Sequence, residues 1–322
     1  MNEYLGIDIG GTKLAVCRGR ADGTITASHR FPTADTPEPR SACDRLAESL
    51  LAIAADLDPE TPVGVSAPGP LSSAEGCLLN PPNMPLWHDF DLRSALEVRL
   101  ARPVAIMNDA NAAAAAEWRW GAGRGTQTMV FFTMSTGMGA GLVVGGRLHQ
   151  GASELAGEVG HTRVAPDGPV GFGRRGSLEG FCSGPGIRQL AVAHLHQARH
   201  GNQPSLLFRD DRDYRLVDMP EIGSAARAGD AVALEVFEEV GRRLGDYCSG
   251  LVDLLNPDAI VVGTIGRLFA EFILPTTRRV IDESVHPRAA RQVQLLPAAL
   301  GDATGDLASI AVALFATGQL DQ

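Results

Sequence analysis

The chain has 322 residues, of which 44% are hydrophobic and 20% charged, and its formal net charge at pH 7 is −10. This composition excludes disordered and collagen-like chains. The acidic balance argues against a nucleic-acid partner, because phosphate backbones are neutralised by clustered Lys and Arg. A chain of this length predicts two domains.

The compartment is predicted from the cysteines and the apolar runs. The five cysteines are scattered and none forms a Cys-x-x-Cys pair, which is typical of proteins in a reducing compartment. The N-terminus opens on the strand-like run Tyr4–Ile9 and lacks the regions of a signal peptide. No apolar run reaches the ~18 residues that a membrane span needs. We therefore expect a soluble, cytoplasmic protein without a membrane partner.

Short β-branched runs alternate with stretches rich in Ala and Leu, a pattern typical of an α/β fold. The expected strands, in chain order, are Tyr4–Ile9, Leu14–Arg20, Thr24–Phe31, Val63–Ser66, Val104–Asn108, Thr128–Met134, Gly141–Val144 and Ala259–Val262. The expected helices are Ala42–Ala55, Asn111–Trp120, Arg188–His200, Ala231–Leu255 and Asp306–Thr317. The polar stretch Gly201–Tyr214 is expected to be an exposed loop, and Asp302–Asp306 to cap the last helix.

The two halves of the chain open alike, each with a strand that runs into a Gly/Thr turn. These turns are Gly10-Gly11-Thr12 and Ser135-Thr136-Gly137. The similarity predicts a duplicated fold with a cleft between the halves. We expect a small domain of residues 1–110, completed by the C-terminal helix at residues 305–322, and a larger domain of residues 111–304.

The first motif, Gly6-Ile-Asp8-Ile-Gly10-Gly11-Thr12-Lys13, combines bare backbone with polar side chains. Glycines able to adopt positive φ let N–H groups approach a phosphate closely. Thr12 adds a hydroxyl and Lys13 a charge, and Asp8 at the strand end can hold a hydrated Mg²⁺. A P-loop is rejected, because Thr precedes Lys and a strand follows. The alternative is a tight β-hairpin without a ligand.

The second motif, Ser135–Gly141, alternates three glycines with other residues and does not match the dinucleotide spacing G-x-G-x-x-G. It offers bare backbone for a second phosphate contact, or it is a glycine-rich turn between core strands. Two such turns, each after a strand, together favour a nucleotide site.

The third motif, Asn108-Asp109-Ala110-Asn111, follows a strand and opens a helix. Polar residues at strand ends face ligands in α/β folds. Phosphoryl transfer to a hydroxyl needs one carboxylate that orients the nucleophile and accepts its proton, and Asp109 fits that role. The alternative is that Asp109 only caps the alanine-rich helix.

The fourth group of polar residues comprises Glu158 and His161 in Gly157-Glu-Val-Gly-His161, followed by Glu179. Side chains of these types pair with adjacent sugar hydroxyls, and a site built to pair hydroxyls rejects analogues that lack them. The alternative is that each is a solvated loop residue.

Taken in order, these motifs resemble the ROK group of bacterial sugar kinases and repressors, within the actin-like ATPase superfamily. The resemblance runs from Leu5 to about Phe315 and rests on Gly6–Lys13, Ser66–Pro70, Pro82–Pro85, Asn108–Asn111, Ser135–Gly141 and Gly157–His161. It implies an α/β fold of two actin-like (ribonuclease-H-like) domains flanking an interdomain cleft, and a homodimer.

The resemblance also implies the site. It assigns ATP phosphates to Gly10, Gly11, Thr12, Lys13, Thr136 and Gly137, with the adenosine side near Gly263 and Mg²⁺ at Asp8 through water. It assigns a sugar to Asn83, Asn108, Asp109, Glu158, His161 and Glu179. Asp109 is then the general base of an ATP-dependent hexose kinase, acting on O6 of a glucose-like sugar. The rival substrates are N-acetylmannosamine, N-acetylglucosamine, fructose and allose, and the rival function is a non-catalytic sugar sensor.

The chain departs from the resembling family in a zinc-binding loop. The family usually carries C-x-C-G-x-x-G-C-L-E, which binds a structural zinc together with the histidine that corresponds to His161. The same frame here reads Val170-Gly-Phe172-Gly-Arg-Arg-Gly-Ser177-Leu-Glu179, so all three cysteines are replaced. We predict no zinc, since these side chains cannot replace thiolates, and we hypothesise that apolar packing by Val170 and Phe172 substitutes for it.

Two further departures concern the nucleotide and DNA. The adenosine-side stretch, Val261-Val-Gly263-Thr-Ile-Gly266, has fewer consecutive glycines than the family usually carries. The family's repressors carry an N-terminal helix-turn-helix, whereas this chain begins at the first strand. We therefore expect no DNA-binding domain.

Overall fold

The computed structural model describes residues 3–209 and 212–320, which form strands and helices in alternation. They divide into two units. Unit 1 comprises residues up to Phe131 together with Gly141–Gly157 and the segment from Ala299 onward, and unit 2 comprises Phe132–Ala140 and Glu158–Ala298. None of the helices in the described ranges is long and apolar enough to cross a membrane.

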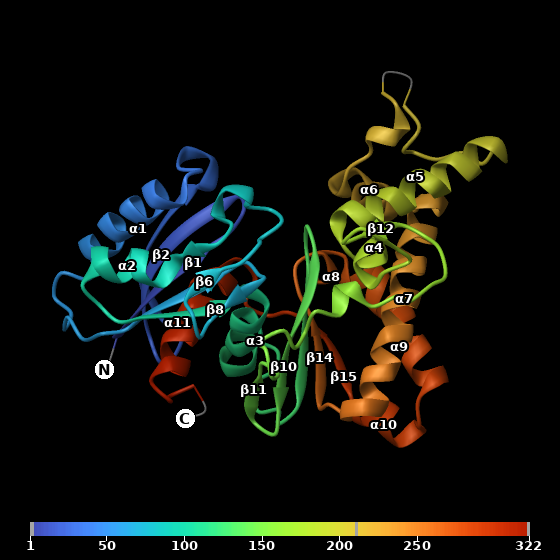
Figure 1. Cartoon of the computed structure of the whole chain (residues 1–322). Helices are drawn as coiled ribbons and strands as arrows, with labels where there is room; N and C mark the ends of the chain where they lie inside the picture. The colour runs from blue at the N-terminus through green and yellow to red at the C-terminus, as the bar shows by residue number, and fades with distance from the viewer. Residues whose placement is uncertain (1–2, 210–211, 321–322) are drawn as a thin grey trace. The chain divides into compact units, whose positions relative to one another are not determined.

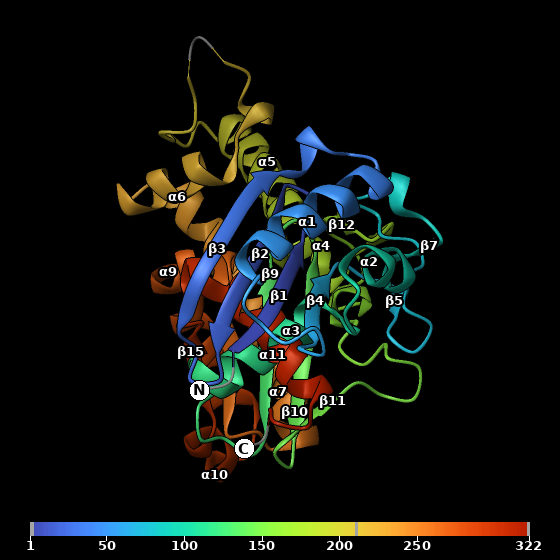
Figure 2. The same cartoon turned by 90° about the vertical axis from the view of Figure 1, so that its left-hand side faces the viewer.

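Unit 1 is built on a five-stranded sheet in which the first two strands form a hairpin. Its strands, in spatial order, are β3 (Ile25–Pro32), β2 (Lys13–Arg20), β1 (Glu3–Ile9), β4 (Val63–Ala67) and β8 (Val104–Asn108). The pairs β3–β2 and β2–β1 are antiparallel, whereas β1–β4 and β4–β8 are parallel. Figure 2 shows β3, β2, β1 and β4 side by side.

Helices cover both faces of this sheet (Figure 1). Alternate residues of a strand point to opposite faces. Leu5 and Ile7 therefore face the core formed with α1 (Pro39–Ile53) and α2 (Leu92–Leu100). On the other face, Tyr4 joins the core formed with the helices α3 (Asp109–Trp120) and α11 (Thr304–Ala316).

Helix α11 packs closely on the sheet because two strand glycines carry no side chain there. A Cβ on Gly6 or on Gly64 would overlap Ser309 of the helix. This close packing brings the start of α11 beside the end of β1, where a Cβ on Gly305 would overlap the Asp8 carboxylate. The C-terminal helix therefore helps to build the surroundings of Asp8.

The remaining elements of unit 1 are short. A small sheet pairs β5 with β6 and β6 with β7, and single 3-10 turns lie nearby. Their bounds are β5 (Leu71–Ser72), β6 (Cys77–Leu78), β7 (Phe90–Asp91), η1 (Thr33–Asp35), η2 (Pro85–Trp87) and η5 (Gly301–Ala303).

The second large sheet has the strand order β11-β10-β9-β14-β15. Its strands are β11 (Arg147–His149), β10 (Met138–Val144), β9 (Met129–Met134), β14 (Ala259–Val262) and β15 (Gln294–Pro297). The division between the units passes through β9 and β10.

Helices make up most of unit 2, and the longest is α7 (Ala231–Leu255). Asp230 caps its start by accepting from the N–H of Ala233, and Asn256 ends it in the left-handed conformation. The other elements are η3 (Val159–His161), β12 (Val170–Gly171), β13 (Arg174–Arg175), α4 (Leu178–Cys182), α5 (Gly184–His200), η4 (Tyr214–Leu216), α6 (Met219–Arg227), α8 (Ile265–Leu268), α9 (Ala270–Ser284) and α10 (Pro287–Gln292).

The structure confirms the α/β fold class and the strands and helices predicted from sequence, to within a few residues at most ends. Two predictions were wrong. The strand expected at Gly141 already begins at Met138, so only Ser135–Gly137 forms the turn. Asp302–Asp306 does not cap the last helix through a side chain, because Thr304 instead donates its hydroxyl to Gly301 O. The domain boundary near residue 110 stays a prediction.

Candidate active site

The first Gly/Thr turn joins β1 to β2 and is fixed by its own backbone and by Thr33. Gly10 N–H donates to Lys13 O over 2.9 Å, and Thr33 Oγ1 donates to Gly10 O over 2.7 Å. Neither Gly10 nor Gly11 adopts the positive φ that glycine allows, so these glycines contribute only the lack of a side chain. With Gly10 N–H already engaged, the exposed Gly11 and Thr12 are the candidates for contact with a phosphate.

Asp8 lies at the end of β1, with its side chain largely buried. Its Oδ2 is 3.6 Å from Lys13 Nζ. Burial raises the pKa of the Asp8 carboxyl, Lys13 opposes this effect, and the nearby Asp306 adds to it. Asp306 in turn is paired with Arg30 at 2.6 Å and accepts from Ser28 Oγ at 3.1 Å. A cation beside Asp8 would favour its charged form, so the carboxylate fits an Mg²⁺ role.

Gly305 leaves room for the Asp8 carboxylate itself, and a side chain at this position is expected to impair nucleotide binding. A Cβ at Gly305 would overlap Asp8 Oδ2. We expect Gly305→Ala to raise the KM for Mg-ATP about tenfold, equivalent to ~1.4 kcal/mol, in steady-state kinetics. The matched control is Gly250→Ala, also in a helix but with open space at the Cβ position, which should leave KM unchanged. An unchanged KM in Gly305→Ala would contradict this account of Asp8.

Asn83 lies on the same side of unit 1 as the first turn. Gly11 and Asn83 both line a cavity of about 210 Å³, and a Cβ on Gly11 would lie 3.5 Å from the Asn83 Cβ. The cavity is otherwise lined by Thr33, Ala34, Pro37, Met84, Pro85, Leu86 and Trp87. Unit 1 thus brings one predicted sugar residue against one predicted phosphate residue.

Asn108, and not Asp109, caps helix α3. Asn108 Oδ1 accepts from the N–H groups of Ala110 (3.0 Å) and Asn111 (3.4 Å). Asp109 is the first helical residue, its side chain is exposed, and its Oδ1 accepts from Ala110 N–H at 2.8 Å. The alternative, that Asp109 only caps the helix, is therefore wrong, because Asn108 holds the cap position.

We expect Asn108→Ala to lower the free energy of unfolding by about 1 kcal/mol, because the cap is lost, and also to weaken sugar binding. Thermal unfolding and sugar titration measure the two effects. Asp91→Ala is the matched control, because Asp91 caps α2 through Ser94 N–H at 3.0 Å and has no predicted sugar role. Equal sugar affinity in the two variants would leave Asn108 with a capping role only.

In unit 2, Glu179 holds the second Gly/Thr turn. Glu179 Oε2 accepts from Met138 N–H at 3.1 Å, and a Cβ on Gly137 would lie 3.0 Å from the same oxygen. Ser135 N–H closes the turn by donating to Gly137 O at 2.9 Å, and Thr136 is exposed between them. The structure therefore joins a predicted sugar residue, Glu179, to the predicted phosphate turn.

Glu158 and His161 lie at the two ends of one 3-10 turn, η3. His161 Nε2 is 3.5 Å from Glu158 Oε2. The His161 ring stacks on the ring of Phe172, with centroids 3.6 Å apart and planes at 20°. A Cβ on Gly160, between them in sequence, would lie 3.3 Å from the Glu179 Cβ. The three predicted sugar residues of unit 2 are thus neighbours.

Gly263 follows β14 and its backbone N–H is already used within the protein. It donates to Phe132 O at 2.8 Å, and the residue is buried. Thr264 then turns the chain with φ 45°. A nucleotide contact at Gly263 therefore cannot use the Gly263 N–H group. The role of Gly263 near the adenosine stays a prediction.

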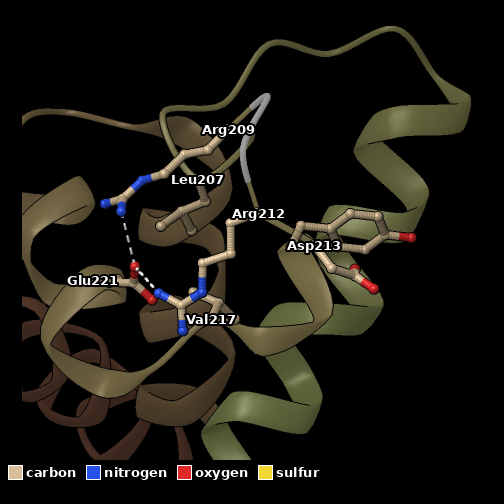
Figure 3. Close-up of a pocket in the computed structure, with 7 residues that line it drawn as sticks. Leu207, Arg209, Arg212, Asp213, Val217 and Glu221 are labelled. Carbon is tan, nitrogen blue, oxygen red and sulfur yellow. Dashed lines mark hydrogen bonds and ion pairs between the residues drawn. The ribbon is translucent and has the colours of Figure 1, made fainter.

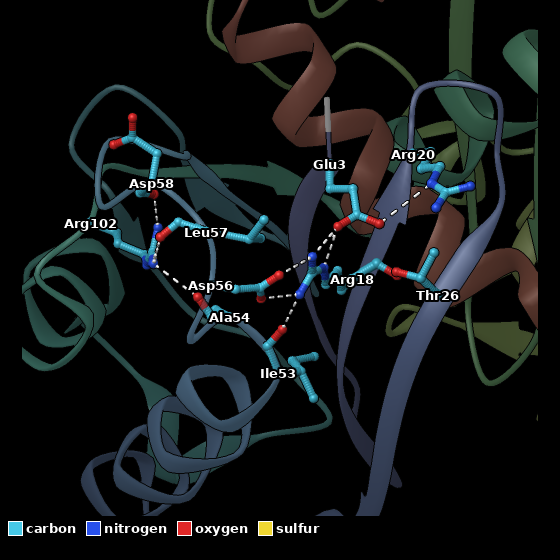
Figure 4. Close-up of polar contacts among 10 residues, drawn as sticks. All are labelled: Glu3, Arg18, Arg20, Thr26, Ile53, Ala54, Asp56, Leu57, Asp58 and Arg102. Carbon is cyan, nitrogen blue, oxygen red and sulfur yellow. Dashed lines mark hydrogen bonds and ion pairs between the residues drawn. The ribbon is translucent and has the colours of Figure 1, made fainter. Parts of the chain in front are cut away.

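Two clusters of ionic residues lie apart from the predicted site residues. In unit 1, Arg18 joins Glu3 and Asp56, and Glu3 also pairs with Arg20 (Figure 4). In the same view Arg102 donates to backbone carbonyls that include Leu57 O. These contacts connect strands to the segment after α1, which is a structural role.

In unit 2, Arg209 and Arg212 converge on Glu221 Oε1 at 3.2 and 2.6 Å (Figure 3). Glu221 also completes a capping box with Asp218 at the start of α6. The adjoining cavity has a volume of about 10 Å³, which is roughly the room for one water. These ion pairs hold Arg209 and Arg212 against the start of α6, and this small cavity has no room for a substrate.

The sequence did not reveal two contributions to the site. Gly305 and Asp306 surround Asp8 from the far end of the chain, whereas their local sequence resembled a helix cap. Thr33 fixes the first turn from beyond β3. The packing of α11 on the sheet places Gly305 and Asp306 beside Asp8. The pairing of β3 with β2 places Thr33 beside the first turn.

Comparison with known proteins identifies relatives over nearly the whole chain. A model of the ROK family matches residues 4–315. A glucokinase of Halalkalibacterium halodurans is 30% identical over 311 residues, covering 94% of this chain and 92% of the relative. An N-acetylmannosamine kinase of Escherichia coli O139:H28 is 34% identical over 260 residues, covering 80% and 81%.

Solved structures agree with these relatives. A ROK family glucokinase from Streptomyces griseus, crystallised with glucose and AMPPNP, superposes with a TM-score of 0.76 at 31% identity, covering 98% of this chain and 99% of that chain.

Proposed function

We propose that this chain, which belongs to the ROK family, transfers the γ-phosphate of ATP to O6 of a glucose-like hexose, with Asp109 as the general base. It is an ATP-dependent sugar kinase of the two-domain, actin-like α/β fold. The observation that supports the base most directly is that Asn108 caps α3, so that the exposed carboxylate of Asp109 has a position at the end of β8 without being the helix cap.

The proposed chemistry of Asp109 is simple. The carboxylate accepts the proton of the sugar hydroxyl as the oxygen attacks the γ-phosphorus, and the bond between that phosphorus and the β,γ-bridging oxygen breaks. ADP leaves, and the hexose 6-phosphate forms. Catalysis otherwise consists of positioning and charge stabilisation.

The proposed nucleotide contacts use the two Gly/Thr turns, the segment at Gly263 and one cation. The phosphates are assigned to Gly10, Gly11, Thr12 and Lys13 of unit 1 and to Thr136 and Gly137 of unit 2. The adenosine side is assigned to Gly263. Asp8 would hold Mg²⁺ through water, and the ion would neutralise phosphate charge. The largely buried position of the Asp8 carboxylate against Gly305, and its raised pKa, which a bound cation would oppose, support this assignment.

The proposed sugar contacts are Asn83, Asn108, Asp109, Glu158, His161 and Glu179. Their supporting observations lie within each unit: Asn83 beside Gly11 in unit 1, and Glu158, His161 and Glu179 as neighbours in unit 2. Glu179 also orders the second turn, so sugar binding and phosphate binding would be linked through one side chain.

A coupled assay of ADP release over glucose, N-acetylmannosamine, N-acetylglucosamine, fructose and allose tests the substrate. We expect the highest kcat/KM for glucose. A higher value for another sugar of the panel would replace glucose as the substrate. Sugar binding by calorimetry without ADP release would favour the non-catalytic sensor.

A homodimer, a cytoplasmic location and the absence of bound zinc stay predictions. Sedimentation of the purified protein and elemental analysis test the first and third of these.

A further inference from the structure

Phe172 is an exposed aromatic residue with a defined partner. Its side chain is 53% exposed, yet its ring lies flat against the His161 imidazole, with centroids 3.6 Å apart and planes at 20°. Stacked rings gain more than the burial of their area alone. The contact therefore restrains the tilt of the imidazole from one face.

The backbone at Phe172 does not favour a phenylalanine. The strands β12 and β13 are joined by a two-residue turn in which Phe172 has φ 48° and Gly173 has φ 68°. Positive φ at both central residues is the pattern of a type I′ turn, for which Asn-Gly is preferred. A bulky aromatic residue in this conformation is uncommon. Local turn preference thus fails to explain Phe172, whereas its contact with His161 does.

The residues around His161 do not fit a zinc ion. The three positions that carry cysteine in the resembling family hold Val170, Phe172 and Ser177. Ser177 Oγ donates to Gly171 O at 3.0 Å and accepts from Gly180 N–H at 3.1 Å, so the hydroxyl is already engaged. Across residues 3–209 and 212–320, no group of three or more His, Cys, Asp and Glu side chains is arranged to hold a metal.

We propose that Phe172 is a positioning residue for His161, and that its ring replaces a metal ion in fixing the imidazole. The stack holds the imidazole in the plane in which Nε2 lies 3.5 Å from Glu158 Oε2. The same nitrogen then meets a sugar hydroxyl together with Glu158. The inference rests on the proposed function, in which these two residues bind the sugar.

Phe172→Asn separates positioning from folding, because Asn-Gly suits this turn better than Phe-Gly. We expect an unchanged or higher Tm together with a rise of about three- to tenfold in the KM and Kd for the sugar. The KM for ATP should stay the same. Phe172→Tyr keeps a ring and should keep the wild-type sugar KM. The control is Val170→Thr, which replaces a side chain of the same hairpin by one of similar shape.

A spectroscopic readout tests the stack without any turnover. In wild type, the ring current of Phe172 should shift the carbon-bound protons of the His161 imidazole upfield, and Phe172→Asn should abolish that shift. His161→Gln identifies the signals by their loss. An unshifted signal in wild type, or a sugar Kd in Phe172→Asn equal to that of wild type, would overturn the inference.

Two outcomes separate this inference from the proposed function. If wild type binds sugar but releases no ADP, the kinase proposal fails, while the sugar Kd of Phe172→Asn still measures positioning. If wild type is an active kinase and Phe172→Asn binds sugar normally, only the inference fails. One tightly bound zinc per chain in elemental analysis of wild type would also overturn it.

Discussion

Asp109→Asn is expected to lower kcat by about 10² to 10⁴ while the Kd for the sugar changes little. General-base catalysis contributes on this order, and an amide accepts no proton from the sugar hydroxyl at neutral pH. The amide oxygen can still accept from Ala110 N–H, as Oδ1 does now at 2.8 Å. The start of α3, which Asn108 caps, should therefore stay intact. Single-turnover kinetics and sugar calorimetry measure the two effects.

The control for this variant is Asp253→Asn, the same chemical change at an exposed position of α7. It should leave both kcat and the sugar Kd unchanged. A kcat of Asp109→Asn close to that of wild type would remove Asp109 from the mechanism.

Asp8→Asn is expected to lose about 10² to 10³ in kcat, as for the removal of one strong electrostatic group, and yet to gain thermal stability at neutral pH. Burial raises the pKa of Asp8, against the opposing effect of Lys13 and with a contribution from Asp306. The folded state therefore binds the Asp8 proton more tightly than the unfolded chain, whose carboxyl has the ordinary value of 3.8. At neutral pH the charged carboxylate costs folding free energy, and the amide removes that cost.

The sign of the pH dependence follows from the same shift. As the pH falls through the raised pKa toward 3.8, Asp8 becomes protonated in the folded protein and the cost disappears. The difference in Tm between Asp8→Asn and wild type should therefore shrink over this interval. A variant that is less stable than wild type at pH 7, or equally active, would contradict the account of Asp8. Asp56→Asn, at an exposed carboxylate paired with Arg18, serves as the activity control.

The sequence predicted the fold where local patterns carry the information. The strand Val104–Asn108 and the helix Ala231–Leu255 have the bounds expected from their periodicity and end signals. The short strands β12 and β13 escaped prediction, because two residues are too few to show a period. The last helix was found but its cap was not, since Thr304 bonds backward to Gly301 and no side chain bonds forward.

The candidate site was predicted as a set of residues, but their contacts were not. The motifs placed Asp8 and the first turn correctly at the end of one strand, and the structure adds Gly305 from the other end of the chain. Phe172 was expected only as apolar packing, whereas its ring lies on His161. Contacts of this kind depend on tertiary packing and on one side-chain orientation, which no sequence period encodes.

The central claim is phosphoryl transfer from ATP to a hexose hydroxyl, and direct identification of the product tests it most closely. The purified chain is incubated with ATP, Mg²⁺ and glucose, and the products are identified by ³¹P and ¹³C NMR with Asp109→Asn in parallel. The account predicts one glucose 6-phosphate for each ADP released by wild type and almost none from the variant. ADP release without a sugar phosphate, or equal product from both proteins, would contradict it.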